Sequence, residues 1–372
     1  MKVAIIGHKQ IPGRSGGVEV VVEELASRLA HRGVEVVAYN RKIKGHPSPA
    51  NFDGVHLTDV FAPDNKKLNA VVYSYLATIR AITSGADVIH YHALGPAASL
   101  WLAKLFGGEK KVVVTVHGLN YKTPKWKGFG AKYIKFGERL AMRRADEVVV
   151  LSHSIQDYYR DEYGRECRFL PNGLSMPEGI NDDSCLDRLA LRGHDFLLCV
   201  SRLVPGKGLE HLIEAYKGVS SDAELVIAGD ADHVDDFKKA LKASAADDAR
   251  IRFIGFTSKA DLCALYSAAR LFVFPSEAEG MPIALLEAMW FNCPCLVSDI
   301  PENVEVLEGH GETFPVGDVV ALRKGLQAIC ASWPQRENTR SVVSLNHNWD
   351  RVADETLMIY KEMLSRAGRG SR

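Results

Sequence analysis

Residues 3–39 read VAIIGHKQIPGRSGGVEVVVEELASRLAHRGVEVVAY. Two short apolar runs in it, Val3–Gly7 and Val34–Tyr39, have the composition of strands that are buried on both faces of a sheet. The segment between them, Val18–His31, is predicted to be a helix because apolar residues recur at helical spacing, at Val18, Val21, Val22, Leu25 and Leu29. Strand, helix and strand in this order form the unit of a doubly wound parallel sheet, so the stretch predicts an α/β fold.

The same plan continues along the chain and then starts again. The first half has three more apolar runs, Val88–Tyr91, Val112–Val116 and Val148–Leu151. Residues 171–195 lose the pattern and gain Pro, Gly and Asp, which is typical of a linker. A second series of strands follows, Phe196–Ser201, Glu224–Ala228, Ile251–Ile254, Leu271–Pro275 and Pro294–Ser298, with helices between them such as 259–269.

The chain of 372 residues is longer than one hydrophobic core usually serves, so we expect two domains of roughly 170–190 residues. We predict two Rossmann-like doubly wound domains, at 1–175 and 190–348. The amphipathic segment 349–364 is predicted to be a helix that packs back on the first domain. Two facing α/β domains place strand carboxyl ends on a shared cleft, which predicts a ligand between them.

Composition excludes several classes of function. Lys plus Arg equals Asp plus Glu, 46 against 46, so no overall charge indicates a nucleic-acid partner. No apolar run reaches the roughly 20 residues of a membrane span, and the start MKVAIIG resembles a strand rather than a signal peptide. The seven cysteines form no CxxC pair, and their odd number favours a reducing cytoplasm.

The segment Pro275–Met289, PSEAEGMPIALLEAM, carries the most chemical information. A helix is predicted to begin near Pro282, because proline is favoured in a first helical turn. The free N–H groups and positive dipole of a helix start bind anions, and Glu287, one turn beyond Ile283, could reach sugar hydroxyls beside a bound phosphate. Taken alone, Glu287 and the loop residue Glu279 are more often a solvated pair of acids.

A basic corner follows the strand Phe196–Ser201, in CVSRLVPGKGLEHLIEAY, which starts at Cys199. Arg202 ends the strand, a Pro-Gly turn follows, and Lys207 begins a helix. Two cations on such a corner would neutralise a diphosphate, with charge-assisted contacts worth roughly 1.5–3 kcal/mol each. Taken alone, the corner is equally well a solvated basic turn.

Two weaker signals lie in the first half. Gly16 and Gly17, in IPGRSGGVEVVVEEL, would let the backbone approach a ligand closely before a helix N-terminus, although this is not GxGxxG. His117, in TVHG, follows a buried strand and is predicted to point into the cleft. A single histidine at such a position is more often structural.

Together these four motifs resemble the retaining glycosyltransferases of the GT-B fold, in the large family 4 group. Members of that group carry a Glu-x7-Glu motif in the second domain, an Arg…Lys-Gly corner, an N-terminal glycine loop and a cleft histidine. The same elements occur here in the same order over essentially the whole chain, with Pro171–Gly173 (PNG) at the hinge. The resemblance implies an enzyme that uses a nucleoside-diphosphate sugar and needs no metal or other cofactor.

The resemblance also implies a role for each residue of the glutamate motif. Glu279, with the backbone of Gly280 and Met281, would hold the sugar hydroxyls, and Glu287 would bind the ribose. The helix-start residues that complete the predicted donor-binding set are Pro282 and Ile283.

The remaining motifs are assigned in the same way. Arg202 and Lys207 would clamp the diphosphate, Gly16 and Gly17 would lie close to the phosphate and acceptor, and His117 would contact the donor sugar near its reacting carbon. The predicted catalytic set is His117, Arg202, Lys207 and Glu279. The implied reaction is a front-face displacement through an oxocarbenium-like state, with the diphosphate charge stabilised by Arg202, Lys207 and helix N–H groups.

The first half narrows the resemblance to a bacterial rhamnosyltransferase-type branch that builds capsule and cell-wall polysaccharides, through RSGGVEVVVEELA and HGLNYKTPKWKGFGAKYIKFGE. A glycan or lipid-linked acceptor would follow from this branch. Residues 120–137 interleave lysines with aromatic residues, which predicts peripheral contact with the inner face of the plasma membrane. The bland alternative is a surface helix whose aromatic residues pack inward.

Three positions depart from the pattern of the wider family. Met281-Pro282 stands where an aromatic-Gly pair is frequent, and Pro282 has no N–H to offer the sugar. Asn292 stands where glycine commonly ends the motif helix, although asparagine tolerates the left-handed conformation needed there. Trp290 replaces a small residue. These departures leave the charged motif residues in place and the sugar undetermined.

Two metal-like signals are predicted to be structural. Asp230-Ala231-Asp232 spells DxD but follows a strand as an ordinary turn. His90 and His92 share one strand face, with no nearby Cys or carboxylate in the sequence to complete a zinc set. The alternatives that remain are a nucleotide-sugar epimerase, a phosphorylase, which normally needs a much longer chain, and a catalytically silent nucleotide-sugar-binding scaffold.

Overall fold

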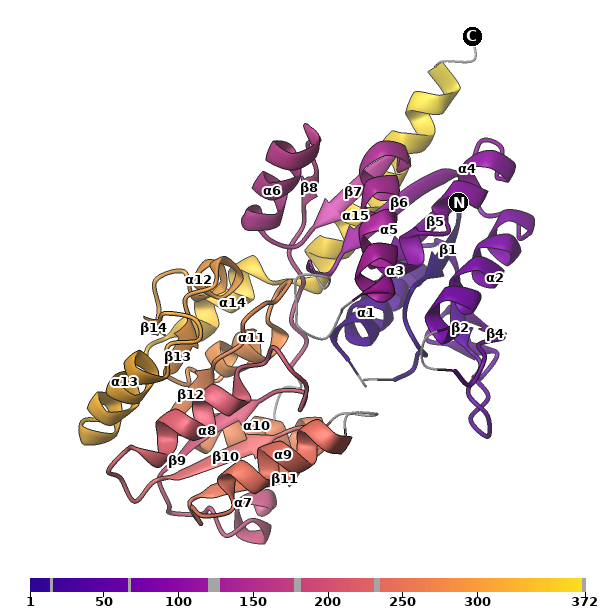
Figure 1. The fold of residues 1–372 in the computed structure, drawn as a ribbon. Coiled ribbons are helices and arrows are strands. Elements are labelled where there is room, and N and C mark those ends of the chain that lie inside the picture. The colour runs from indigo at the N-terminus through magenta and orange to yellow at the C-terminus, as the bar shows by residue number, and fades with distance from the viewer. Residues whose placement is uncertain (14–15, 66–67, 120–127, 177–181, 231–234, 370–372) are drawn as a thin grey trace. The chain divides into compact units, whose positions relative to one another are not determined.

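The computed structural model describes residues 1–372 apart from 14–15, 66–67, 120–127, 177–181, 231–234 and 370–372. The described residues form two compact units, each a parallel sheet covered by helices (Figure 1). The first unit holds the described residues from Met1 to Gly173 together with those from Asn348 onward, and the second holds those from Leu174 to His347. The α/β class predicted from the sequence is confirmed.

The sheet of the first unit has eight strands in the order β3-β4-β2-β1-β5-β6-β7-β8. All neighbours pair in parallel except β3 and β4, which form an antiparallel edge. The strands are β1 (Lys2–Ile6), β2 (Glu35–Arg41), β3 (Asn51–Phe52), β4 (Val55–Val60), β5 (Val88–His92), β6 (Lys111–Val116), β7 (Glu147–Val150) and β8 (Arg168–Phe169). The central strands are buried almost throughout, as expected for a sheet covered on both faces.

Helices join these strands and bury their apolar stripes against the sheet. They are α1 (Gly17–His31), α2 (Asn69–Thr83), α3 (Leu94–Ala97), α4 (Leu100–Phe106), α5 (Phe129–Arg144), α6 (His153–Tyr163) and α15 (Trp349–Arg369). Helix α6 shows clear start and stop signals, since Ser152 caps its first turn and Gly164 ends it in the left-handed conformation. The core of the unit gathers around Ile89, Tyr91 and Val114, which are fully buried.

The C-terminal helix α15 belongs to the first unit although it follows the second in the chain. Arg32, the C-cap of α1, donates to Asp354 on α15 at 2.7 Å. A hydrogen bond of 2.6 Å links His90 Nδ1 on β5 to the hydroxyl of Tyr360, which is fully buried. Side chains from the end of the chain therefore complete the core of its first unit.

The sheet of the second unit has six parallel strands in the order β11-β10-β9-β12-β13-β14. The strands are β9 (Phe196–Val200), β10 (Glu224–Ala228), β11 (Ile251–Gly255), β12 (Leu271–Phe274), β13 (Cys295–Ser298) and β14 (Glu312–Phe314). The helices are α7 (Ser184–Arg188), α8 (Leu209–Lys217), α9 (Asp235–Ala245), α10 (Lys259–Ala268), α11 (Ile283–Trp290), α12 (Pro301–Leu307), α13 (Val319–Ala331) and α14 (Thr339–Asn346).

The boundary between the units, at Gly173 and Leu174, falls inside the predicted linker 171–195, but part of this segment is a helix of the second unit. Helix α7 lies within it and packs on α10. The Cys185 thiol of α7 reaches the carbonyl of Asp261 at 3.7 Å, and Arg188 pairs with the Asp261 carboxylate at 3.0 Å. The sequence hid the helix because its few apolar residues are embedded among Asp, Gly and Arg.

Each sheet has a point where the strand order reverses. In the first unit the chain runs outward from β1 and then returns to add β5 on the other side of β1. In the second unit it runs from β9 to β11 and returns to add β12 beside β9. Loops at such a point diverge to opposite faces and leave space for a ligand at the carboxyl edge of the sheet. The motif residues singled out from the sequence follow these strands.

Candidate functional site

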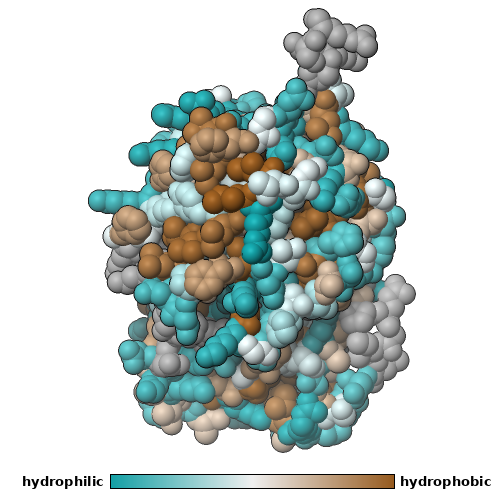
Figure 2. Space-filling model, turned by 90° about the vertical axis from the view of Figure 1, so that its right-hand side faces the viewer, coloured by the Kyte–Doolittle hydropathy of each residue, from teal (hydrophilic) through white to brown (hydrophobic). Residues whose placement is uncertain are grey.

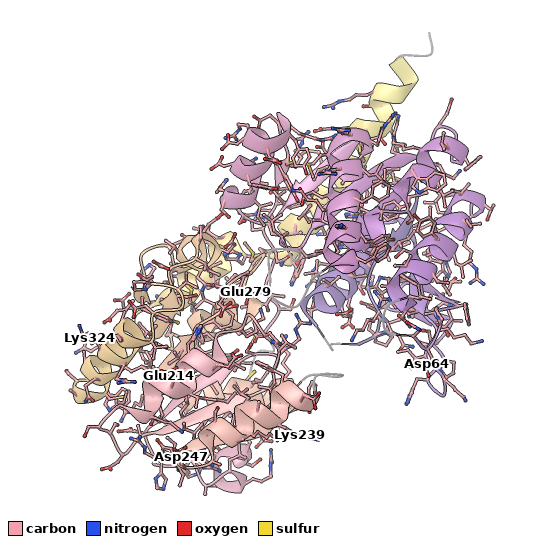
Figure 3. All side chains as sticks on the ribbon, viewed as in Figure 1. Asp64, Glu214, Lys239, Asp247, Glu279 and Lys324 are labelled. Carbon is pink, nitrogen blue, oxygen red and sulfur yellow. The ribbon has the colours of Figure 1, made fainter. Side chains whose placement is uncertain are left out.

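The basic corner and the glutamate loop meet at the carboxyl edge of the second sheet. Strand β9 leads into Arg202, whose side chain is exposed, and then into Lys207 just before α8. Strand β12 leads into Glu279, which Figure 3 marks in the loop ahead of α11. The ammonium group of Lys207 donates to Glu279 Oε1, and both side chains are largely shielded from solvent. The residues lie 72 positions apart, so neither motif predicts this ion pair by itself.

Glycine makes this contact possible. Gly208 is the N-cap of α8 and has a φ of +65°, in the region that favours glycine. A Cβ at this position would collide with the carbonyl oxygen of Pro275, which belongs to the loop after β12. The amide of Glu277 donates to the carbonyl of Gly206 at 3.1 Å, which ties the two loops together.

A buried polar chain supports the glutamate loop, and sequence analysis missed it. The Ser276 hydroxyl donates to Glu279 Oε1 at 2.6 Å. The Ser298 hydroxyl, at the end of β13, donates to the Ser276 carbonyl, and Asn303 Nδ2 on α12 donates to Ser298 Oγ at 2.9 Å. These three supporting residues are fully buried. The only sequence signal was small polar residues directly after two apolar strands.

Helix α11 presents an uncapped start next to this loop. Its N-cap is Pro282, with no side-chain cap and no acidic residue in the first turn. The first-turn N–H groups and the helix dipole therefore favour an anion at this position. The prediction for the other end is confirmed, because Asn292 adopts a left-handed φ of 55° where glycine is common.

Glu287 projects from α11 toward a tyrosine on the neighbouring helix. The hydroxyl of Tyr266, on α10, donates to Glu287 Oε2 at 3.1 Å. Burial, followed by the charge of Glu287, raises the pKa of Tyr266, so the phenol stays protonated and remains a donor. Glu287 is therefore held as an oriented acceptor.

The glycine loop of the first unit is organised by two carboxylates on α1. Glu19 Oε1 accepts from the Lys9 amide at 2.9 Å, and Glu23 Oε2 accepts from the Gly13 amide at 3.0 Å. Gly16 is the N-cap of α1 and Gly17 is its first residue. A Cβ on Gly16 would approach Glu19 Oε2 to 2.7 Å. The charge next to these glycines is therefore the chain's own carboxylate, and their contact with a phosphate stays a prediction.

His117 ends a chain of aromatic and imidazole groups. Its Nε2 is 2.9 Å from Nδ1 of His92, and the two rings stack at 5.2 Å. The ring of His92 lies 4.3 Å from that of His90, which is bonded to Tyr360 and, at 2.7 Å, to Thr115. His92 Nε2 is buried without a hydrogen-bond partner among the described residues. A structural role explains His90, whereas His117 is the partly exposed end of the series.

Burial keeps these imidazoles neutral. It lowers the pKa of His117 to about 4 and that of His90 to about 3, the charge of His117 adding to the effect on His90. It also lowers the pKa of His92, with contributions from the neighbouring histidines. At neutral pH, His117 can therefore donate or accept a hydrogen bond but carries no positive charge.

The metal-like motifs have other partners. Asp230, the first residue of the DxD sequence, pairs with Lys238, while Ala231 and Asp232 lie outside the described residues. His90 and His92 share one strand face as predicted, and their hydrogen bonds go to Tyr360, Thr115 and His117. Within the described ranges, no group of three or more His, Cys, Asp or Glu is placed to hold a metal ion.

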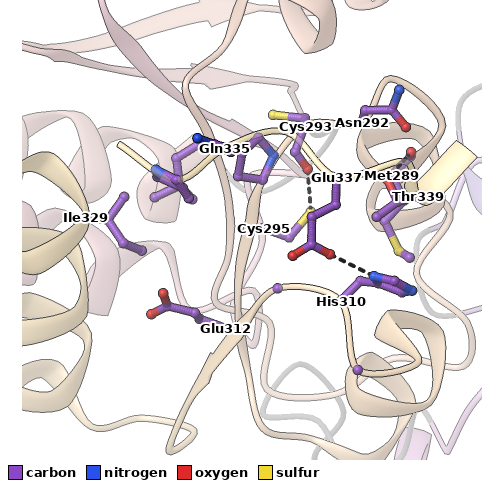
Figure 4. Close-up of a pocket in the computed structure, with 15 residues that line it drawn as sticks. Met289, Asn292, Cys293, Cys295, His310, Glu312, Ile329, Gln335, Glu337 and Thr339 are labelled. Carbon is purple, nitrogen blue, oxygen red and sulfur yellow. Dashed lines mark hydrogen bonds and ion pairs between the residues drawn. The ribbon is translucent and has the colours of Figure 1, made fainter. Parts of the chain in front are cut away.

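A small cavity of about 180 Å³ lies in the second unit at the other edge of the sheet (Figure 4). It is lined by the first residues of β12, β13 and β14, which are Leu271, Cys295 and Glu312. Burial raises the pKa of the neighbouring Cys293 to about 12, so this thiol is not a nucleophile. A hydrogen bond of 2.8 Å between His310 Nδ1 and Glu337 Oε2 closes one side. The cavity touches the end of α11 at Met289 and Asn292, but none of the predicted site residues lines it, and we assign it no part in the site.

Comparison with known proteins identifies the family. The family described as glycosyl transferases group 1 matches residues 188–342, and Glycosyltransferase Family 4 matches residues 15–176. The two matches fall on the two units and follow each other along most of the chain. The chain belongs to these glycosyltransferases.

Individual relatives are distant but extend over the chain. An uncharacterized glycosyltransferase of Methanocaldococcus jannaschii is 25% identical over 99% of this chain and 100% of its own length. A UDP-Gal:alpha-D-GlcNAc-diphosphoundecaprenol alpha-1,3-galactosyltransferase of Escherichia coli is 28% identical over 61% of this chain and 62% of its own. The structure of sucrose-phosphate synthase from Thermosynechococcus elongatus has the same fold, with a TM-score of 0.85, 20% identity, and coverage of 98% and 99%.

The predicted site residues of this glycosyltransferase fall into two groups, one in each unit. The group in the second unit lies at the carboxyl edge of its sheet and consists of Arg202, Lys207, Glu279, Gly280, Met281, Pro282, Ile283 and Glu287. The group in the first unit consists of Gly16, Gly17 and His117, which follow β1 and β6. Both groups follow the strands around a reversal of strand order or directly beside it.

The neutral histidines make stability depend on pH. Histidine has an ordinary pKa of 6.5, and burial lowers that of His90 to about 3. Between these values the unfolded chain binds a proton at this position that the folded chain does not bind. The contribution of neutral His90 to the free energy of unfolding is therefore complete above pH 6.5 and is lost as the pH falls toward 3.

We predict that His90→Gln, which keeps hydrogen-bonding capacity, lowers the free energy of unfolding at pH 7. On acidification, this free energy should fall less in the variant than in the wild type, because the variant has no histidine at this position to protonate in the unfolded state. The gap in free energy of unfolding between wild type and variant should narrow by roughly 2 kcal/mol between pH 7 and pH 5. Denaturant unfolding of the full chain at both pH values measures this gap. A gap that stays constant between pH 7 and pH 5 would contradict the assignment of His90 as a buried neutral group.

Proposed function

We propose that this glycosyltransferase moves a sugar from a nucleoside-diphosphate donor to an acceptor, with retention of configuration and without a metal ion. The observation that supports the proposal most strongly is the pairing of Lys207 with Glu279 beside Arg202 and the uncapped start of α11. A diphosphate needs cations and N–H donors, and a sugar needs an oriented carboxylate. All of these belong to one edge of one sheet.

The donor would bind in three parts. Arg202, Lys207 and the first turn of α11 would hold the diphosphate, taking the place that a divalent cation has in metal-dependent transferases. Glu279, oriented by Ser276, would accept hydrogen bonds from the sugar hydroxyls. Glu287, oriented by Tyr266, would accept from the ribose. In this assignment each carboxylate already has a neutral donor that fixes its direction.

Lys207 would change partners when the donor binds. In the structure its ammonium group pairs with Glu279, so both side chains are held in place by each other. An incoming diphosphate offers Lys207 two negative charges in place of one, while sugar hydroxyls offer Glu279 neutral donors. The ion pair would thus act as a preformed holder for the two ends of the sugar-phosphate bond.

The reaction would replace one bond at the anomeric carbon by another. The bond to the leaving phosphate oxygen breaks as the bond to the acceptor oxygen forms on the same face, and the acceptor proton passes to the leaving phosphate. Arg202 and Lys207 would stabilise the charge that develops on the diphosphate. His117, neutral at physiological pH, would serve as a hydrogen-bonding group near the reacting carbon rather than as a cation.

The acceptor would be a glycan or a lipid-linked saccharide at the cytoplasmic face of a membrane. The rhamnosyltransferase-like stretches in the first half support rhamnose as a donor sugar, and the name of the Escherichia coli relative supports testing galactose as well. Membrane contact through 120–137 belongs to the same proposal. Residues 120–127 lie outside the described part of the chain, and Lys135 forms an ion pair of 2.7 Å with Glu138, so it is less free for lipid headgroups than predicted.

Replacing each of the two glutamates by alanine should weaken the binding of different ligands. Glu287→Ala should weaken binding of the free nucleoside diphosphate and of the intact sugar donor alike, by about tenfold to a hundredfold for a lost charged hydrogen bond. Glu279→Ala should weaken binding of the sugar donor while leaving the nucleoside diphosphate unaffected, because Lys207 then keeps the phosphate as its partner. Calorimetric titration of both ligands measures the four affinities.

Glu214→Ala is the matched control, since Glu214 is an exposed glutamate on α8 of the same unit (Figure 3). It should leave both affinities at the wild-type value. Equal losses for both ligands in both site variants would contradict the assignment of sugar to Glu279 and ribose to Glu287.

The transfer rate should not depend on a divalent metal. Arg202 and Lys207 supply the positive charge at the proposed diphosphate position, and Asp230 of the DxD sequence pairs with Lys238. We expect excess EDTA to leave the initial rate of sugar transfer largely intact. A loss of activity that Mn²⁺ or Mg²⁺ restores would overturn the proposed mechanism.

A further inference from the structure

The first unit holds a half-buried arginine that the proposed transfer reaction does not use. Arg41 ends β2, and its amide donates to the carbonyl of Lys9 at 2.6 Å, so it lies beside the loop that follows β1. In the described part of the chain its guanidinium donates from Nη1 to Asn69 Oδ1 at 3.3 Å, and its Nε is buried without a hydrogen-bond partner. The guanidinium has five N–H donors and a permanent charge, so most of its binding capacity is unused.

Two residues of α2 hold this guanidinium in place. Its central carbon lies over the ring of Tyr73, 5.1 Å from the ring centroid. Tyr73 is fully buried and fixed, because its hydroxyl donates to the Tyr39 carbonyl and accepts from the Gly7 amide at 3.2 Å. Asn69 is fixed as well, since its Nδ2 donates to a backbone carbonyl at 2.9 Å while its Oδ1 accepts from Arg41. The cation is therefore oriented before any ligand arrives, which lowers the entropy cost of binding.

The guanidinium lies at the positive end of a helix. Asn69 is the first residue of α2, a helix of 15 residues whose N-cap, Leu68, provides no side-chain cap and whose first turn has no acidic residue. The dipole at a helix start favours a negative group and disfavours a positive one. Helix α2 lies on the side of the molecule that Figure 2 shows, where hydrophilic side chains lie between apolar ones. Leu68 is exposed and Asn69 partly exposed, so a ligand can reach the helix start from solvent.

No carboxylate among the described residues forms an ion pair with Arg41. Burial lowers its pKa, and the charges of Tyr73 and Glu19 oppose that effect without reversing it. Burial also raises the pKa of Tyr73 to about 12, so at neutral pH its phenol carries no charge and only Glu19 contributes. The Glu19 carboxylate accepts from the Lys9 amide at 2.9 Å. Burial and the helix dipole thus both act against the cation, and a bound oxyanion would relieve both.

We propose that Arg41 and the start of α2 bind an oxyanion, a phosphate or a carboxylate, carried by the acceptor. This inference rests on the proposed function, because it names the chemistry of the acceptor in that reaction. Lys9 ties Arg41 to the loop after β1, and the same loop leads to Gly16 and Gly17, which are predicted to lie close to the acceptor. A neutral glycan would leave the charge of Arg41 without a partner, so an acidic acceptor is preferred.

The oxyanion could belong to a soluble saccharide or to a lipid-linked one, and Arg41 binds it by the same charge-assisted hydrogen bonds in both. Among the described residues no helix is long and apolar enough to cross a bilayer. A competition experiment separates the two sources of the oxyanion.

Calorimetric titration of the full chain with pyrophosphate tests the proposal by counting anion sites. The wild type should bind two molecules, one at Arg41 and one at the proposed diphosphate position of Lys207. Arg41→Gln should weaken the first site by about tenfold to a hundredfold and leave the second unchanged, whereas Lys207→Gln should do the reverse. Arg41→Lys keeps the charge without the planar fork, so it should weaken the first site by less than Arg41→Gln does.

Lys42→Gln is the matched control, because Lys42 is the next residue of the chain and an exposed cation. It should bind two molecules of pyrophosphate as the wild type does. Thermal unfolding separates an anion site from a structural arginine. In buffer free of polyvalent anions, Arg41→Gln should unfold at the wild-type temperature or above it, because the variant removes a charge without an ion-pair partner.

The oxyanion site is overturned if Arg41→Gln binds pyrophosphate with the stoichiometry and affinity of the wild type, or if Lys42→Gln loses as much binding. It is equally overturned if Arg41→Gln unfolds at a lower temperature while both sites remain. Failure of the donor assignment looks different, because Lys207→Gln would then leave both sites intact while Arg41→Gln removes one.

The source of the oxyanion follows from competition in the Lys207→Gln variant, where the Arg41 site remains. Displacement of pyrophosphate by glucose 6-phosphate or glucuronate supports a soluble acidic saccharide, and displacement by farnesyl diphosphate supports a lipid-linked acceptor. Glucose, which is neutral, should displace nothing. The acceptor role is overturned if glucose competes as well as the charged probes do, or if none of the charged probes competes.

Discussion

The neighbouring positions of strands β9 and β12 determine what the second unit can do. The chain forms β9, β10 and β11 outward and then returns, so two loops that are distant in sequence leave the sheet side by side. At Gly208 the loops come so close that no side chain fits between α8 and Pro275. The cation of one loop then reaches the carboxylate of the other, and Lys207 and Glu279 form their ion pair. Without this reversal of strand order, the two motifs would lie on unrelated parts of the sheet.

In the first unit, a reversal of strand order also brings two strand ends together, but the side chains that meet there are of a different kind. Its strand order reverses between β1 and β5, and Gly7, with a φ of +131°, lies against the backbone of His92 at that point. Here the meeting groups are imidazoles that burial keeps neutral, backed by Tyr360 from the terminal helix. The reversal in the second unit therefore brings charged groups together, whereas the reversal in the first unit brings together imidazoles that are neutral at physiological pH.

Most strands of the two sheets, and the loops that carry the motif residues, could be predicted from the sequence. Strands buried on both faces are continuous apolar runs, so β1, β9 and β12 could be recognised, and with them the loops that carry Arg202 and Glu279. Contacts between residues far apart in the sequence could not be predicted, and the ion pair of Lys207 with Glu279 is such a contact. The supporting chain from Ser276 to Asn303 was missed because small polar residues have no periodic pattern. Membrane contact through the lysine-rich stretch 120–137 stays a prediction, and the pairing of Lys135 with Glu138 one turn away could not be predicted from the spacing of lysines and aromatic residues.

A diffraction structure of the chain with a bound nucleoside diphosphate tests the central claim most directly. The account predicts the diphosphate at the carboxyl edge of the second sheet, with its oxygens within hydrogen-bonding distance of Arg202, Lys207 and the first turn of α11. Glu287 should then accept from the ribose. A nucleotide bound instead in the cavity near Cys295 and Glu337, or bound without contact to Lys207, would contradict the account.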